Sequence, residues 1–198
     1  MIELTAALLM FLLPLAYSPG PGNLFFATNG ARFGLRSTIP ANSGYHVATW
    51  LVTVALGLGF AAVVHQFPGL FSFIHVTGSL YVLWLAWKLM RSGMPNSDYK
   101  AKVASFRDGV VLLLLNPKAY FIIAAMFAQF LDPGRADQLM LVLWISTIFT
   151  LNNLLAFTCW TLAGDRLAAL LRSESNARIM NPGFGALLAV VALWMLFS

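Results

Sequence analysis

The chain has 198 residues, of which 60% are hydrophobic and only 10% are charged, and its mean hydropathy is +0.79. This composition excludes an ordinary soluble globular domain and is typical of a polytopic membrane protein. The net charge of +5 is explained by membrane topology and anionic lipid, so no nucleic-acid partner is expected.

Charge-free runs mark the predicted helices in chain order. Residues 4–31 carry no charge, and neither do residues 37–87, a run too long for one crossing that Gln66–Gly69 divides in two. A helix needs roughly 20 apolar residues to cross the hydrocarbon. We therefore predict an all-α membrane protein with six transmembrane helices at approximately 4–30, 38–64, 69–91, 107–131, 138–163 and 181–197. The stretch 165–180 is either a short interfacial helix or a solvated loop.

The basic loop residues lie almost entirely on one side of this topology. Arg135 is on the opposite side from all the others, which are Arg32, Arg36, Lys88, Arg91, Lys100, Lys102, Arg107, Arg166, Arg172 and Arg178. The positive-inside rule then predicts that both termini face outward. The first span lacks the basic n-region and cleavage site of a signal peptide, so we expect it to be a mature helix. A single cysteine, Cys159, excludes a disulfide within the chain.

Helix-breaking motifs interrupt the first and fourth predicted helices. The first is Ser18-Pro19-Gly20-Pro21-Gly22-Asn23 and the second is Asn116-Pro117-Lys118. A broken helix exposes backbone groups that hydrocarbon cannot satisfy, so it survives where it lines a cavity. Breaks at corresponding positions of two halves are typical of a transporter substrate site. Pairing Pro19 with Pro117 predicts a single transmembrane transporter domain, 1–198, built as an inverted 3+3 repeat of halves at approximately 1–95 and 96–198.

The first break suits an anion. Pro19 and Pro21 remove two backbone donors, and Gly20 adds conformational freedom. Asn23 begins a half-helix whose positive dipole end would face a carboxylate. A plain proline kink is the alternative, although two prolines and two glycines within four residues are more than a kink requires.

Lys118 is the only charged side chain well inside a predicted span. A lysine at the helix centre costs about 2.5–3.5 kcal/mol, and such residues are functional hypotheses by default. Lys118 could hold a substrate carboxylate, or release a proton during transport because desolvation disfavours its charged form. The structural alternatives are snorkelling to an interface or contact with Asn116 and neighbouring carbonyls.

Polar residues in the second helix of each half could close the same cavity. They are Asn42, Ser43, Tyr45, His46 and Thr49 in one half, and Asn152 and Asn153 in the other. His46 is a proton-coupling candidate because histidine titrates near physiological pH. For each residue alone, ordinary interhelical hydrogen bonding is the simpler interpretation.

The chain resembles the LysE/RhtB superfamily of amino-acid exporters along its whole length. The resemblance rests on Pro19-Gly20-Pro21, Arg32-Phe33-Gly34-Leu35-Arg36, Leu115-Asn116-Pro117-Lys118-Ala119 and the stretch from Gly78 to Lys88. It implies amino-acid export from the cytoplasm across a bacterial inner membrane, with proton antiport and no cofactor. Within the superfamily, the chain most resembles the cysteine/O-acetylserine exporter branch, and the stretch Cys159–Gly164 is part of that resemblance. A homodimer is left open.

One departure from the family pattern bears on the substrate. Many members carry Gly-x-x-x-Gly-Asp in the second helix, whereas this chain has Thr49 at the acidic position. No carboxylate remains in the apolar body of any predicted span, and a buried cation needs a countercharge. We therefore expect a neutral amino acid, with its carboxylate at Lys118 and near Asn23. Its ammonium would meet carbonyls freed by the two breaks, together with Asn152 or Asn153.

Two other functional classes fit these residues less well. A cation, metal-ion or basic amino-acid exporter of the same superfamily is disfavoured by the missing intramembrane carboxylates. An intramembrane enzyme would need a base beside a nucleophile, and Ser43 with His46 has no orienting acid. Three scattered histidines and one cysteine do not form a metal site, so neither catalytic residues nor a metal is expected.

Overall fold

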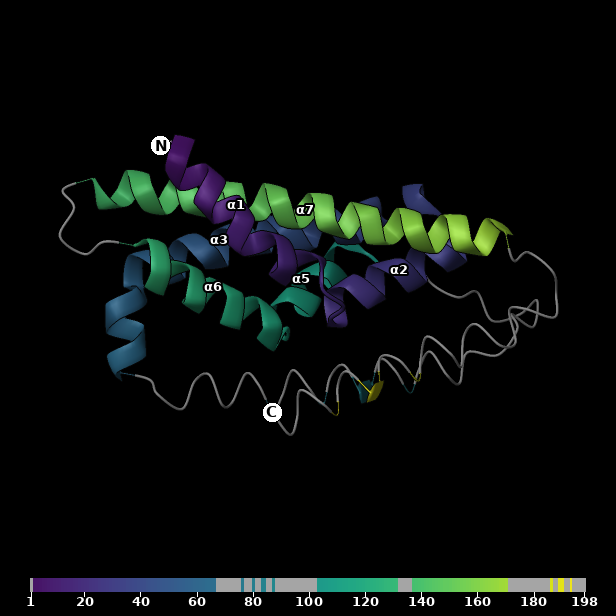
Figure 1. Ribbon diagram of the computed structural model, residues 1–198. Coiled ribbons are helices and arrows are strands. Elements are labelled where there is room, and N and C mark those ends of the chain that lie inside the picture. Colours follow the sequence, from purple (N-terminus) through teal and green to yellow (C-terminus); the bar gives the residue numbers. More distant parts are fainter. Residues whose placement is uncertain are drawn as a thin grey trace.

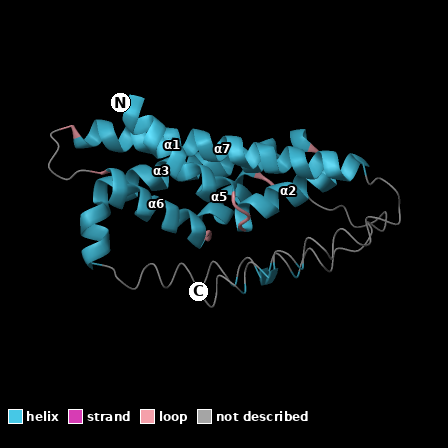
Figure 2. Ribbon diagram, viewed as in Figure 1, coloured by secondary structure: helices cyan, strands magenta, loops and turns pink. Residues whose placement is uncertain are grey.

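A computed structural model describes residues 2–66, 103–131 and 137–170, together with positions 76, 80, 83, 84, 87, 186, 189, 190 and 193. In these ranges the secondary structure is entirely helical, which confirms the predicted all-α class (Figure 2). The predicted spans 69–91 and 181–197 fall almost wholly outside the described residues.

The first predicted span forms two helices, α1 (Ile2–Tyr17) and α2 (Pro21–Phe33), which meet at a bend of 62°. The fourth forms α5 (Phe106–Leu114) and α6 (Pro117–Phe130), which meet at 61°. Pro21 and Pro117 each occupy the first turn of the second helix of a pair, where the missing N–H has no helical acceptor in any case. Pro21 and Pro117 thus occupy the same position in their helices, whereas Pro19, which the sequence pairs with Pro117, lies in the break between α1 and α2.

Two long helices complete the described bundle, α3 (Leu35–Gln66) and α7 (Gln138–Leu170). They correspond to the predicted spans 38–64 and 138–163. The helix α7 continues without interruption into the segment that the sequence left open between interfacial helix and loop. Figure 1 shows α7 running beside both α1 and α2, and these pairs are in contact, as are α3 with α5 and α3 with α7.

Close helix crossings depend on glycine. A Cβ on Gly109 would collide with the Ala41 carbonyl, and one on Gly44 would collide with the Phe106 carbonyl, so α3 and α5 approach backbone to backbone. Gly30 and Gly164 make the same kind of reciprocal contact between α2 and α7, against the carbonyls of Thr161 and Ala27. Small residues at such crossings are typical of membrane helices, where tight packing replaces the hydrophobic effect.

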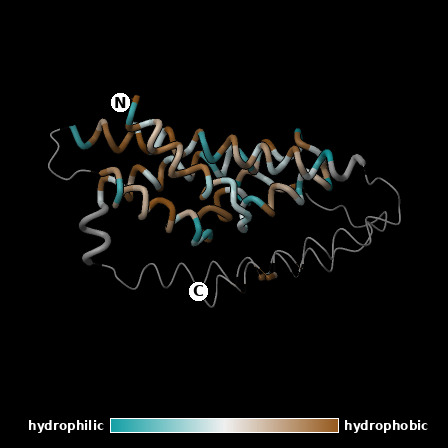
Figure 3. The backbone as a smooth tube through the Cα atoms, in the orientation of Figure 1, coloured by the Kyte–Doolittle hydropathy of each residue, from teal (hydrophilic) through white to brown (hydrophobic). Residues whose placement is uncertain are grey.

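The interior of the bundle holds an apolar core together with a set of polar side chains, and many large apolar side chains are exposed on its outside. Figure 3 shows hydrophobic and hydrophilic positions interspersed along the helices. The buried polar side chains are Asn23, Thr28, Thr38, Asn42, His46, Thr49, Thr53, Asn116, Ser146, Asn152, Asn153 and Thr161. Large apolar side chains more than half exposed include Leu13, Leu51, Leu58, Phe121, Leu151 and Leu155. Within the described ranges, Gln138–Arg166 alone is long and apolar enough to cross a membrane, and counting each bent pair as one span raises the number to three. Exposed apolar side chains on the outside of the bundle are expected for a protein surrounded by lipid.

Candidate functional site

The end of α1 leaves five consecutive carbonyls near the break, and every one accepts a hydrogen bond. The Pro14 carbonyl accepts from the Ser18 amide at 3.2 Å, and the Leu15 carbonyl accepts from the Ser18 hydroxyl at 3.0 Å. The three that follow are satisfied from other elements: Ala16 by Asn23 Nδ2 at 2.9 Å, Tyr17 by Trp160 Nε1 at 3.1 Å and Ser18 by Lys118 Nζ at 2.7 Å. The first break is thus held by donors from α2, α7 and α6. A backbone end buried away from water requires this kind of complete pairing.

Lys118 joins the two breaks. Its ammonium also donates to the Ser18 hydroxyl at 3.0 Å, and its alkyl stem lies over Gly20, where a Cβ would come within 2.7 Å of the Lys118 Cδ. The lysine therefore contacts a carbonyl of the opposite break, not one neighbouring it in sequence. A lysine inserted between backbone oxygens is a ready partner for an incoming carboxylate.

At the second break, the key side chain is Asn116. It caps α6 with an extended backbone, is 3% exposed and donates from Nδ2 to the Tyr45 hydroxyl at 2.7 Å. Its other end, Oδ1, is buried without a hydrogen-bond partner. The Leu114 carbonyl of this break accepts from the Tyr120 hydroxyl at 3.2 Å. Since an unmet buried acceptor is unfavourable, Asn116 Oδ1 is suited to accept a hydrogen bond from a ligand.

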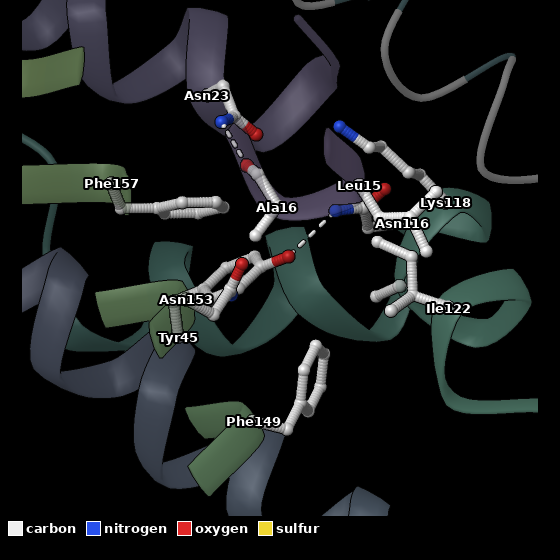
Figure 4. Close-up of a pocket in the computed structure, with 11 residues that line it drawn as sticks. Leu15, Ala16, Asn23, Tyr45, Asn116, Lys118, Ile122, Phe149, Asn153 and Phe157 are labelled. Atoms are coloured by element: carbon white, nitrogen blue, oxygen red, sulfur yellow. Dashed lines mark hydrogen bonds between the residues drawn. The ribbon is translucent and has the colours of Figure 1, made fainter. Parts of the chain in front are cut away.

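A cavity lies between the two breaks (Figure 4). Its volume is about 10 Å³, which is close to the space that one water molecule needs. An amino acid is too large for this space. The residues that line it are Leu15, Ala16, Asn23, Tyr45, Asn116, Lys118, Ala119, Ile122, Phe149, Asn153 and Phe157. Lys118 is the only charged side chain in this lining, and no carboxylate accompanies it among the described residues.

His46 lies next to this lining, and only 5% of its surface is exposed. Its Nδ1 lies 2.8 Å from the Asn42 carbonyl and its Nε2 lies 3.4 Å from Asn153 Nδ2. Its ring packs against those of Tyr45 and Phe157, with centroids 5.2 Å and 5.3 Å away. His46 therefore contacts a residue of the cavity without lining the cavity itself.

The structure brings together only part of the predicted site. Asn23, Asn116, Lys118 and Asn153 line the cavity, whereas Pro19, Gly20, Pro21 and Pro117 shape the two breaks. Thr49 and Asn152 are buried outside the lining; the Thr49 hydroxyl donates to the Tyr45 carbonyl at 2.8 Å, within its own helix. The freed carbonyls of α1 already have donors, so the expectation that a substrate ammonium would meet them does not hold in this conformation.

The sequence indicates Tyr45 only as one of several polar residues that could close the cavity, and it does not indicate Phe157 or Trp160 as site residues. Tyr45 was visible as a polar residue on the same helix as His46, and the spacing from Asn42 to Thr49 gives one helical face. Nothing in the local sequence marks Phe157 or Trp160, because their roles depend on how α7 packs against the break. Ser43 is exposed while His46 is buried, so these two do not form the pair that an intramembrane hydrolase would need. Within the described residues, no group of His, Cys, Asp and Glu side chains could hold a metal ion.

Comparisons with known proteins agree with this architecture. A family model described as LysE type translocator matches residues 13–198. The chain is 30% identical over 192 residues to an uncharacterized membrane protein of Vibrio cholerae, covering 94% of this chain and 93% of that protein. It is 25% identical to a homoserine/homoserine lactone efflux protein of Salmonella typhimurium, covering 89% of this chain and 88% of the relative. A cysteine/O-acetylserine efflux protein of Escherichia coli is also 25% identical, with 85% and 86% covered. No solved structure matches.

Proposed function

The chain belongs to the LysE type translocator family, and from that premise we propose that it is a secondary exporter of neutral amino acids or close derivatives. It moves them from the cytoplasm outward across the bacterial inner membrane by proton antiport. The relatives named as homoserine and cysteine/O-acetylserine efflux proteins support amino-acid export. Their equal identity to this chain, 25% in both cases, favours neither branch.

The observation that carries the proposal is Lys118 in a cavity whose other described polar groups are neutral. A carboxylate entering the cavity replaces the Ser18 oxygens as the partner of Lys118 Nζ. This exchanges a hydrogen bond to a neutral acceptor for an ion pair, which is the stronger interaction for a partly buried ammonium. A second cation on the substrate side chain would remain uncompensated. Neutral side chains are therefore preferred over those of lysine and arginine.

The substrate ammonium would lie on the side of the cavity away from Lys118. Asn116 Oδ1 offers a buried acceptor that has no partner, and Asn153 lines the same cavity from α7. Hydrogen bonds from the three N–H donors of the ammonium would satisfy these amide oxygens. Leu15, Ile122 and Phe149 supply the apolar part of the lining, which suits an uncharged side chain.

Transport requires the cavity to open alternately to the two sides. We take each bent pair, α1 with α2 and α5 with α6, as one broken transmembrane helix, and the two halves, approximately 1–95 and 96–198, as an inverted repeat. The nearly equal bends of 62° and 61° support that relation. The hydrogen bond from Lys118 to Ser18 joins the two halves in this conformation, which we take as the closed one. Displacement of Ser18 by substrate weakens this link, so that one half can rock against the other. With both termini outside, the basic loops face the cytoplasm.

Reconstitution tests the proposal. Proteoliposomes preloaded with tritiated homoserine, O-acetylserine or lysine are placed in a more acidic buffer, so that protons flow inward as the amino acid leaves. We expect saturable efflux of the two neutral compounds and little efflux of lysine. Lys118→Ala and Pro19→Ala should both slow efflux strongly, whereas Ser43→Ala, on the exposed face of α3, serves as the matched control. Unchanged efflux in either of the first two variants would show that the assigned site is wrong.

A further inference from the structure

We propose that His46 and Asn153 make proton binding and substrate binding mutually exclusive, through reversal of the Asn153 side-chain amide. This inference rests on the proposed function and deepens it by naming the coupling pair and the way it acts. His46 is a positioning residue, because it acts on the substrate only through Asn153.

The hydrogen bonds fix the state of His46. Its Nδ1 is 2.8 Å from the Asn42 carbonyl, which can only accept, so Nδ1 carries the hydrogen. A neutral imidazole protonated at Nδ1 has a lone pair at Nε2, and Asn153 Nδ2 lies 3.4 Å away as its donor. With its NH₂ end turned to His46, Asn153 has its oxygen free to serve the cavity that it lines. The neutral histidine therefore belongs with the form of the site that accepts an ammonium.

Protonation reverses this arrangement. A proton added to Nε2 turns it into a donor that faces the donor Nδ2 of Asn153. Rotation of the Asn153 amide by a half-turn brings Oδ1 to His46 and restores the hydrogen bond. The NH₂ end then faces the cavity, where it offers a substrate ammonium a donor in place of an acceptor. The substrate loses one of its acceptors and gains a positive charge nearby, and both effects expel it.

The described groups around His46 include no acid in contact with its imidazole. On its own helix, the neighbouring titratable group is Tyr45, whose hydroxyl accepts from Asn116. The α6 helix contributes Lys118 to the same cavity and Tyr120, which bonds to a backbone carbonyl. On α5, Asp108 is engaged in capping its own helix through Ser105. The residues that α2 and α7 place around His46 and Tyr45 are Phe26, Phe157 and Asn153. Of these described groups, none is an acid in contact with the imidazole.

Antiport requires that the proton and the substrate are not bound to the protein at the same time. In the outward-open state the substrate leaves and a proton binds His46 Nε2 from outside. In the inward-open state that proton passes to the cytoplasm, the Asn153 amide turns back and a new substrate binds. One proton enters for each amino acid that leaves, and no other co-reactant takes part.

The test measures exchange of tritiated homoserine across proteoliposomes whose inner and outer pH are equal. Between about pH 4 and 7 the ammonium of homoserine keeps its charge and its carboxylate stays mostly ionised, so a pH dependence of exchange reports on groups of the protein. For the wild-type protein we expect the half-saturating concentration to rise as pH falls, by up to about tenfold per pH unit. His46→Gln should flatten this dependence. Asn153→Ala should flatten it too while leaving His46 in place, and the double variant should add nothing further.

A second measurement uses net transport. A pH difference of one unit should drive wild-type accumulation of up to about tenfold, and His46→Gln should abolish that accumulation. Ser43→Ala is the matched control on the same helix. A pH-dependent affinity or proton-driven accumulation that persists in both His46→Gln and Asn153→Ala overturns the coupling pair while exchange itself upholds the exporter. Absence of exchange in the wild-type protein, with homoserine and with O-acetylserine, overturns the exporter and the coupling together.

Discussion

Lys118 Nζ, at the start of α6, lies 2.7 Å from the carbonyl oxygen of Ser18, at the end of α1. This bond joins two breaks that lie about half the chain apart, and it uses the only charge in the described cavity lining. The same ammonium that closes the structure is also the group best suited to a substrate carboxylate. Closure and recognition therefore compete for one side chain.

Gly20 allows the stem of Lys118 to reach Ser18. In Gly20→Ala the new methyl group would lie 2.7 Å from the Lys118 Cδ, while the extended backbone at φ −166° accepts alanine without strain. We expect the protein to fold and the lysine to be displaced, with about a tenfold rise in the half-saturating concentration of homoserine. Exchange kinetics and unfolding temperature, measured together, check this. A normal affinity in Gly20→Ala would mean that the position of the lysine is immaterial.

Tyr45 orients Asn116. Tyr45→Phe removes the hydroxyl that accepts from Asn116 Nδ2 at 2.7 Å and leaves a buried donor unpaired. We expect a loss of about 1–3 kcal/mol in the free energy of unfolding, and weaker homoserine binding because the amide can turn. Tyr17→Phe is the control, because its hydroxyl is on a side chain only partly buried. If Tyr45→Phe matched the wild-type protein in both unfolding and exchange, Asn116 would not depend on Tyr45.

Trp160 holds the end of α1 from α7. Trp160→Phe keeps an aromatic ring but removes the donor to the Tyr17 carbonyl at 3.1 Å, so about 1–3 kcal/mol of stability should be lost. Trp144→Phe removes a comparable bond, to the Thr5 hydroxyl at 3.0 Å, but a threonine hydroxyl can turn to another partner. Thermal unfolding in detergent should show the larger decrease for Trp160→Phe. Equal decreases would argue against a special role for the break.

Gly109 sets the distance between α3 and α5. Gly109→Ala would drive a methyl group into the Ala41 carbonyl, and backbone cannot move aside as a flexible side chain can. We expect the helices to separate, with a loss of about 1–3 kcal/mol and a lower unfolding temperature. Ala163→Val, beside Gly164 on the exposed face of α7, enlarges a residue away from any crossing and should be nearly neutral. A stable Gly109→Ala protein would contradict the close crossing.

Within the described ranges, the helices and the breaks could be predicted from sequence because composition and proline are local signals. Pro21 and Pro117 fix where α2 and α6 begin. The depth of Lys118 in the membrane stays a prediction from counting residues along the span. The partners of these groups could not be predicted in the same way. Trp160 reaches the Tyr17 carbonyl because α7 packs against α1, and Lys118 reaches the Ser18 carbonyl because α6 does. A single sequence does not specify this packing.

The polar face of α3 shows the same limit. Asn42, Tyr45, His46 and Thr49 share one side of the helix, and the sequence favoured Thr49 because of its place in the family pattern. The structure gives the cavity to Tyr45 and turns the Thr49 hydroxyl back to its own helix. Which turn of a helix reaches a cavity depends on the crossing geometry, which the Gly44 and Gly109 contacts set.

The central claim is that Lys118 recognises a substrate carboxylate, and homoserine compared with its lactone tests it most directly. The lactone keeps the amine but has no free carboxylate. In exchange assays with the wild-type protein we expect homoserine to half-saturate at about a ten- to hundredfold lower concentration than the lactone, the value of a charged hydrogen bond of about 1.5–3 kcal/mol. Lys118→Met, which keeps the stem and removes the charge, should erase that difference. An equal preference for homoserine in the wild-type protein and in Lys118→Met would contradict the account.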